Sequence, residues 1–130
     1  MQGKLKGMTR EPYESEELVS LIIQGMEDTK AKNIMILDLQ DIEHAITNYF
    51  VICHGSSKPQ LEAIADAIIG KTIKGVKAKP WHKEGFENAE WILLDYVDVV
   101  VHIFKEDRRK FYQLEKLWAD AVVKHHEYKE

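Results

Sequence analysis

The sequence predicts a single α/β domain with a mixed β-sheet of about five strands flanked by helices. Apolar residues recur at helical spacing in three stretches, and short apolar runs lie between them. The length of 130 residues fits one hydrophobic core. Hydrophobic residues make up 45% of the chain and charged residues 31%, a globular composition, and no apolar run approaches the roughly 20 residues of a membrane-spanning helix.

The first half of the chain is expected to contain an arm, a helix and two strands. Residues 1–13 carry two glycines and scattered charge and are predicted to form a flexible arm. A helix is expected to begin near Ser15, where apolar residues start to recur at helical spacing, and to end around residues 30–33. The apolar run 34–39 and the run 49–53, rich in aromatic and β-branched residues, are predicted to be strands.

The clearest local signal is a helix start at Ser57. Ser57 can cap the helix, Pro59 fits its first turn, and Gln60 can complete a capping box. One apolar stripe follows at helical spacing, formed by Leu61, Ile64, Ala65, Ile68 and Ile69. The sequence therefore predicts a long amphipathic helix that ends near Gly75.

The second half is expected to add three strands and a last helix. Residues 76–81 are a candidate short edge strand, and residues 83–90 are expected to form a loop. Residues 91–96 and 98–104 are the strongest strand candidates. A helix is predicted from about residue 107 to residue 121.

Charge and cysteine content restrict the classes of function. The net charge is −4 and the pI is near 5.9, which does not suit a protein that binds nucleic acid mainly by neutralising phosphates. The only local excess of basic residues is taken to be the first ten residues. A single cysteine excludes an internal disulfide and a multi-thiolate zinc site. It suits a reducing compartment, and because nothing suggests secretion the protein is expected in the cytoplasm or in an organelle matrix.

No catalytic histidine, metal or cofactor is predicted. The histidines do not have the spacing of metal ligands; they are His44, His54, His82, His102, His125 and His126. In one strand, Asp98 and His102 would stand roughly 13 Å apart, so they cannot form a hydrogen-bonded dyad. A partly buried His102 bonded to a neighbouring element is the preferred interpretation. Cys53 and His54 point to opposite faces of a strand and cannot act together.

One enzyme class stays open as an alternative. Nucleotidyltransferases place Gly-Ser before a helix, as Gly55-Ser56 stand here, and hold divalent cations between two carboxylates on a later strand. The candidate carboxylates are Asp95 and Asp98, whose i, i+3 spacing puts them on opposite faces of a strand or on either side of a hairpin. Gly55 to Ser57 are also explained as a turn and helix cap.

Aromatic residues in the second half favour a binding module instead. They are interleaved with charged residues and comprise Trp81, Phe86, Trp91 and Tyr96. Tryptophan and tyrosine are enriched at interface hot spots. The alternative interpretation is that Trp91 belongs to the core and that Trp81 covers the sheet, and composition leaves both open.

Several segments together resemble the Iojap-like ribosomal silencing factors. They are ITNYFVICHGSSKPQLEAIADAI, EG, WILLDYVDVVVHIF and YQLEKLW, which follow one another in the order of the family over roughly residues 16–121. The resemblance implies a nucleotidyltransferase-like topology without the catalytic carboxylates. It gives the organisation as arm 1–13, silencing factor domain 14–123 and polar, fraying tail 124–130.

The resemblance also implies a mode of action. Family members dock on ribosomal protein fourteen at the intersubunit face of the large ribosomal subunit. There they sterically prevent the small subunit from joining, which represses translation when nutrients are scarce. No catalysis, cofactor or membrane is implied, and a homodimer is possible. The net charge, rather than the resemblance, leads us to expect little direct nucleic-acid binding.

Seven residues are predicted to contact the partner. Matching of the motifs gives Glu84, Gly85, Trp91, Asp95, Tyr96 and Asp98. Trp81 is added on physical grounds, because KPWHKEG replaces a less aromatic stretch of the family.

The sequence departs from the family at a hairpin. The family has Asp-Tyr-Gly-Asp where residues 95–98 read Asp-Tyr-Val-Asp. A β-branched Val97 disfavours the positive φ that a tight two-residue turn requires, so a longer or different turn is expected. Residues 95–98 are expected to be exposed at its tip. Asn48 also replaces an acidic residue, and Cys53-His54 replace small residues.

Overall fold

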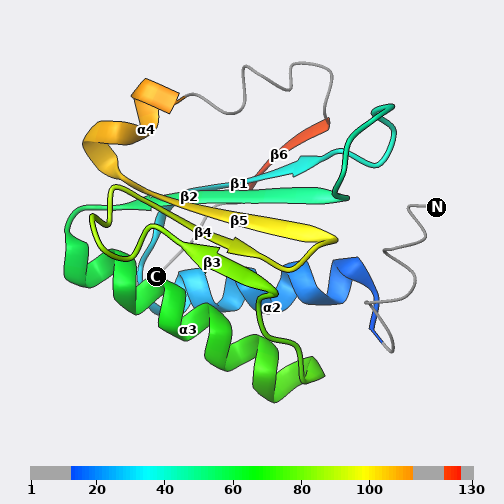
Figure 1. Cartoon of the computed structure of the whole chain (residues 1–130), viewed down its shortest axis with the longest axis horizontal. Coiled ribbons are helices and arrows are strands. Elements are labelled where there is room, and N and C mark those ends of the chain that lie inside the picture. The colour runs from blue at the N-terminus through cyan, green and yellow to red at the C-terminus, as the bar shows by residue number, and fades with distance from the viewer. Residues whose placement is uncertain (1–12, 113–121, 127–130) are drawn as a thin grey trace.

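Six strands form one mixed sheet in the order β3-β4-β5-β2-β1-β6 (Figure 1). The computed structural model describes residues 13–112 and 122–126, with side chains up to residue 109. The strands are β1 (Lys32–Asp38), β2 (Tyr49–Gly55), β3 (His82–Glu84), β4 (Trp91–Asp95), β5 (Val99–Lys105) and β6 (Val122–His126). β2 and β5 are parallel and the other neighbouring pairs are antiparallel. The predicted α/β domain with a mixed sheet is confirmed.

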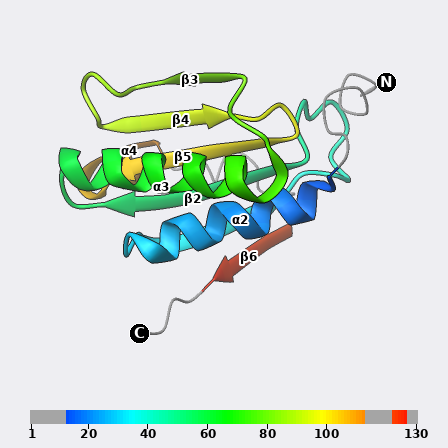
Figure 2. The same cartoon turned by 90° about the horizontal axis from the view of Figure 1, so that it is seen from below.

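Two helices cover one face of this sheet (Figure 2). They are α2 (Ser15–Asp28) and α3 (Lys58–Val76), and most of the core lies between them and the strands. The predicted cap of α3 is confirmed, because the Ser57 side chain accepts a hydrogen bond from the Gln60 N–H. The helices cross closely at Gly25, where an added Cβ would stand 2.8 Å from the backbone of Ile68.

The opposite face of the sheet carries a second, smaller cluster. It consists of Met35, Leu37, Leu39, Ile52 and Phe104, with Phe50 and Trp91 packed against it. The short helix α4 (Glu106–Tyr112) follows β5 on this side (Figure 1). No helix in the described part of the chain is long and apolar enough to cross a membrane.

The structure corrects two of the predicted elements in the second half. Residues 76–81 do not form a strand, because Val76 is the last residue of α3 and Lys77 caps it at a φ of 59°. Strand β3 forms instead at residues 82–84, partly within the stretch predicted as a loop. Its three residues are exposed, so they carry no hydrophobic pattern that identifies them as a strand.

The chain ends also differ from the predicted boundaries. Strand β6 brings residues 124–126 into the sheet beside β1, so the predicted tail is wrong there. Tyr13, assigned to the arm, is buried in the core. Predictions for residues 1–12, 113–121 and 127–130 lie outside the described residues.

Candidate partner-binding face

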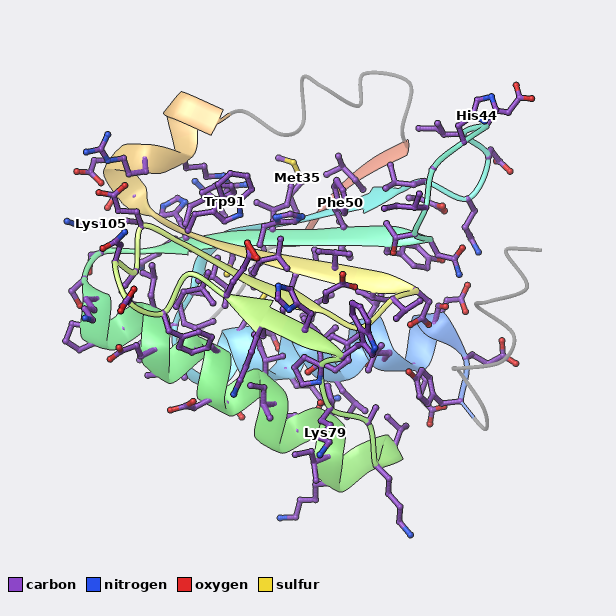
Figure 3. All side chains as sticks on the ribbon, viewed as in Figure 1. Met35, His44, Phe50, Lys79, Trp91 and Lys105 are labelled. Atoms are coloured by element: carbon purple, nitrogen blue, oxygen red, sulfur yellow. The ribbon has the colours of Figure 1, made fainter. Side chains whose placement is uncertain are left out.

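The sheet face away from α2 and α3 has an aromatic centre. This aromatic face is formed by Met35, Phe50, Trp91, His102 and Phe104, and Figure 3 shows Met35, Phe50 and Trp91 on the side of the sheet opposite those helices. Trp91 stands opposite Phe104 in the β4–β5 pairing, with ring centroids 5.0 Å apart. Phe50 meets His102 edge to face at 4.6 Å. Trp91 and Phe50 are partly buried, so both keep some surface for a partner.

His102 holds Trp91 in place. The indole N–H of Trp91 donates to Nδ1 of His102 over 3.0 Å, which requires a neutral ring with its proton on Nε2. Burial lowers the pKa of His102 to about 3, so the ring stays neutral at ordinary pH. His102 Nε2 has no hydrogen-bond partner among the described residues. The predicted structural histidine, bonded to a neighbouring strand, is confirmed.

Two carboxylates lie along the β3–β4 edge of the aromatic face. Asp95 pairs with His82, and Glu84 pairs with Leu93, so these side chains share the face of Trp91. Glu84 is exposed and lies 2.9 Å from His82, while Asp95 is partly exposed. Glu84 and Asp95 therefore form an acidic rim beside an aromatic centre.

The hairpin tip is buried on the helix side, against the prediction of an exposed tip. Tyr96 is 1% exposed and its hydroxyl lies 2.9 Å from the Thr72 hydroxyl, while burial raises its pKa to about 12. Asp98 is 0% exposed and accepts a 2.7 Å hydrogen bond from Ser15. Neither side chain is presented to a partner. The alternation of β4 explains this, since Tyr96 continues the inward series of Ile92 and Leu94.

Val97 adopts a backbone conformation that β-branched residues strongly disfavour. Its φ is 80°, and the Tyr96 N–H donates to the Val99 carbonyl over 2.8 Å, which closes a two-residue loop. A positive φ at the first loop residue alone is the sign pattern of a type II′ turn. The Val97 N–H also donates to Asp95 Oδ1 over 2.8 Å. The expectation of a longer turn is therefore wrong, and the loop holds a β-branched residue under strain.

Val97→Gly is expected to raise the free energy of unfolding by about 0.5–1 kcal/mol. Relief of roughly 1–2 kcal/mol of left-handed strain exceeds the roughly 0.5–1 kcal/mol that glycine loses through chain entropy. Val97→Ala keeps a Cβ at the same φ and should give no gain, so it is the matched control. Urea denaturation of the three proteins measures the difference. A Val97→Gly protein no more stable than Val97→Ala would show that the turn is unstrained.

Gly85 supports Trp91 through the backbone. Its φ is +92°, and an added Cβ would stand 2.0 Å from the Trp91 carbonyl oxygen. Only glycine fits this close approach of the β3–β4 connection to β4. The position therefore serves the scaffold of the aromatic face.

Trp81 precedes β3 and is 77% exposed. Its backbone N–H donates to the Asp95 carbonyl over 2.8 Å, which fixes the position of the residue. Its ring centroid lies 6.2 Å from that of His82. The interpretation of Trp81 as a cover of the sheet is wrong.

The residues of the enzyme alternative lie at opposite ends of the sheet. In the parallel β2–β5 pair, Gly55 stands beside Lys105, whereas Asp98 precedes Val99 at the other end. The seven-residue strand between them separates the two by roughly 20 Å. The N–H and hydroxyl of Ser56 donate to the side-chain oxygen of Gln60 in the first turn of α3, so Ser56 supports the start of that helix. No group of three or more His, Cys, Asp or Glu residues that could hold a metal occurs within residues 13–109.

Phe50, His102 and Phe104 belong to the face but were not among the predicted contacts. The alternation of YFVIC and VVVHIF carries the signal, because every second residue of each run points to the same side. What the sequence does not show is which of the two sides the helices cover.

Comparisons with known proteins extend this description. The family model described as "Ribosomal silencing factor during starvation" matches residues 12–130. A protein of Halalkalibacterium halodurans named Ribosomal silencing factor RsfS is 41% identical over 110 residues, which cover 82% of this chain and 90% of the relative. A Bacillus subtilis protein of the same name is 40% identical over 109 residues, with 83% and 90% covered.

The fold also matches a solved structure. A crystal structure of a Chromobacterium violaceum protein superposes with a TM-score of 0.76 at 33% sequence identity. The match covers 82% of this chain and 88% of that chain.

Proposed function

Because this chain belongs to the ribosomal silencing factor family, we propose that it binds the large ribosomal subunit and sterically blocks the small subunit from joining. Such an action needs only occupancy, so no catalysis is required. The enzyme alternative has no observation in its favour, since Gly55-Ser56 and Asp98 lie at opposite ends of the sheet.

The proposed partner on the large subunit is ribosomal protein fourteen, which would dock on the aromatic face. The observation that carries this proposal is the partly exposed Trp91, fixed by His102 and bordered by the acidic rim. Interfaces combine a buried aromatic anchor with a polar rim. Carboxylates at the rim suit the basic surface expected of a ribosomal protein, because opposite charges steer the encounter.

The proposed contact set follows from exposure. Trp91, Glu84 and Asp95 are the direct contacts on this face. Tyr96 and Asp98 hold the hairpin from inside, and Gly85 lets the β3–β4 connection approach Trp91.

Steric blocking is tested with purified ribosomal subunits. Protein added to large subunits before small subunits should lower the yield of joined ribosomes in a sucrose gradient and sediment with the large subunit. Unchanged joining at saturating protein and low salt would rule out the proposed action.

The acidic rim is tested with the double variant Glu84→Gln, Asp95→Asn. Both changes keep the side-chain size, and the amide oxygen introduced by Asp95→Asn can still accept from the Val97 N–H. Loss of two rim charges should weaken binding to isolated ribosomal protein fourteen by about three- to tenfold and reduce its dependence on salt. The matched control is the double variant Glu62→Gln, Asp66→Asn on α3. It removes equal charge from the other side of the molecule and should bind as the parent does. Equal affinity of both double variants would remove the rim from the interface.

A further inference from the structure

A basic corner lies where α3 ends and β3 begins. Residues 71–83 hold five of the 18 Lys and Arg residues and none of the 22 Asp and Glu residues. The rest of this chain is therefore more acidic than its net charge of −4 suggests. The expectation that only the first ten residues carry a local basic excess is wrong. We define the basic corner as Lys74, Lys77, Lys79, Lys83 and Trp81.

These lysines follow one another along the chain from the last turn of α3 to β3. Lys74 lies in the last turn of α3 and Lys77 caps the helix. Lys79, which Figure 3 labels, lies between this cap and β3. All four lysines of the corner are exposed. Within residues 71–83, Lys71 pairs with Asp28 over 3.2 Å. The described residues show no carboxylate partner for the lysines of the corner.

Local stability does not explain the whole group. A lysine in the last turn stabilises the negative end of the helix dipole, which explains Lys74. Lys79 lies beyond the helix and Lys83 lies on a strand, where the dipole does not act. Lys83 is placed over the Phe86 ring, with its Nζ 5.5 Å from the centroid. The described residues give no such role to the side chains of Lys77 and Lys79, and the whole group remains exposed as a positive surface.

Trp81 gives this surface a flat aromatic group. Its side chain is 77% exposed, although its backbone is fixed by the hydrogen bond to Asp95. An exposed indole with a fixed backbone, flanked in the chain by exposed lysines, offers the two contacts that a nucleotide can use, namely stacking on a base and charge pairing with a phosphate. An acidic peptide or an anionic membrane would use the charges but provide no base to stack.

We propose that the basic corner binds single-stranded RNA, with Trp81 stacked on an unpaired base and the lysines on the flanking phosphates. Lysines are point charges without a base-reading geometry, so the contact is independent of sequence. The proposal deepens the proposed function, on which it rests, since a factor seated on the large subunit meets ribosomal RNA there. It replaces the expectation of little direct nucleic-acid binding, which was drawn from net charge alone.

The probe is a fluorescently labelled, unstructured RNA of about 12 nucleotides, titrated with the full chain and followed by anisotropy. Four lysine–phosphate contacts predict that the logarithm of the binding constant falls with the logarithm of salt concentration with a slope of about −3. Trp81→Ala should weaken binding by about tenfold with an unchanged slope, since it removes stacking and no charge.

A triple variant separates charge from stacking. This variant carries Lys74→Gln, Lys77→Gln and Lys79→Gln. It should reduce the slope of the salt dependence to about −1 and weaken RNA binding by at least about tenfold at low salt. The matched control Lys30→Gln, Lys32→Gln, Lys58→Gln neutralises three lysines near the start of α3 and should bind as the parent does. Melting temperatures of all variants should stay close to that of the parent, because these side chains are exposed.

The outcomes distinguish this proposal from the proposed function. Absence of RNA binding by the parent at low salt, or equal binding by the triple variant and its control, overturns the RNA contact. The triple variant is also tested against isolated ribosomal protein fourteen and phosphatidylserine vesicles. If it loses affinity for one of these but keeps its affinity for RNA, the corner belongs to that other partner and the RNA contact is overturned too. If subunits join normally in the presence of the protein while RNA binding is intact, the proposed function is overturned but the RNA contact is not.

Discussion

Tyr96→Ala is expected to lower the free energy of unfolding by about 3–5 kcal/mol, the cost of truncating a buried aromatic side chain. Tyr96 is 1% exposed and belongs to the core cluster between the sheet and the helices. Its removal leaves a cavity and deprives the Thr72 hydroxyl of one partner. Since a domain is stable by about 5–15 kcal/mol in total, this change alone removes a large share.

Two variants separate the ring from its surroundings. Tyr96→Phe keeps the ring and loses only the hydroxyl, and Thr72 still donates to the Ala78 carbonyl over 2.8 Å, so a cost of about 1 kcal/mol is expected. Asp95→Asn, at a partly exposed neighbour, should change stability by less than about 0.5 kcal/mol. Urea denaturation followed by circular dichroism measures all three. A Tyr96→Ala protein as stable as the parent, but with weaker partner binding, would place Tyr96 at the interface, as the motif comparison predicted.

Local signals were sufficient for the helices. The cap at Ser57 and the apolar stripe of α3 depend on contacts within a few residues, so the sequence contains them. Strands β3 and β6 were missed because their pairing gives no local pattern. The residues of β3 are all exposed, and only the neighbouring β4 makes them a strand.

The hairpin shows why the site was only partly predictable. Strand alternation distinguishes Trp91 from Tyr96, yet the burial of the tip depends on distant partners. Ser15 lies 83 residues from Asp98, and Thr72 lies 24 residues from Tyr96. The preference of valine for negative φ is a local rule, which the contacts around Val97 overrode.

Acidification should destabilise the domain through His102, and the sign follows from its lowered pKa. An unfolded histidine titrates near pH 6.5, whereas burial lowers the pKa of His102 in the folded state to about 3. Below pH 6.5 the unfolded state takes up a proton that the folded state does not. The stability from the neutral ring is therefore complete above pH 6.5 and is lost as the pH falls toward 3.

The expected loss is about 1.4 kcal/mol per pH unit, or about 2 kcal/mol between pH 6.5 and pH 5. Protonation of Nδ1 would also remove the acceptor for the Trp91 N–H, so the anchor of the aromatic face is expected to loosen with it. Burial and the neighbouring Arg109 lower the pKa of His54 as well, and His54 contributes in the same direction. The parent can therefore lose more stability on acidification than His102 alone would explain.

His102→Gln isolates the contribution of His102, because glutamine does not titrate and its side-chain oxygen can accept from Trp91. This variant starts from a lower stability, since it disturbs packing between Phe50 and Phe104. The informative quantity is the change of the unfolding free energy with pH between about pH 7 and pH 5. For His102→Gln this slope should be smaller than for the parent by the amount that the uptake of about one proton contributes. His54→Gln is the control for a second buried histidine. In this variant the contribution of His102 to the change of unfolding free energy with pH should be unchanged. Equal slopes for the parent and His102→Gln would mean that His102 titrates in the folded protein as it does in the unfolded chain. The neutral acceptor for the Trp91 N–H would then be lost already near pH 6.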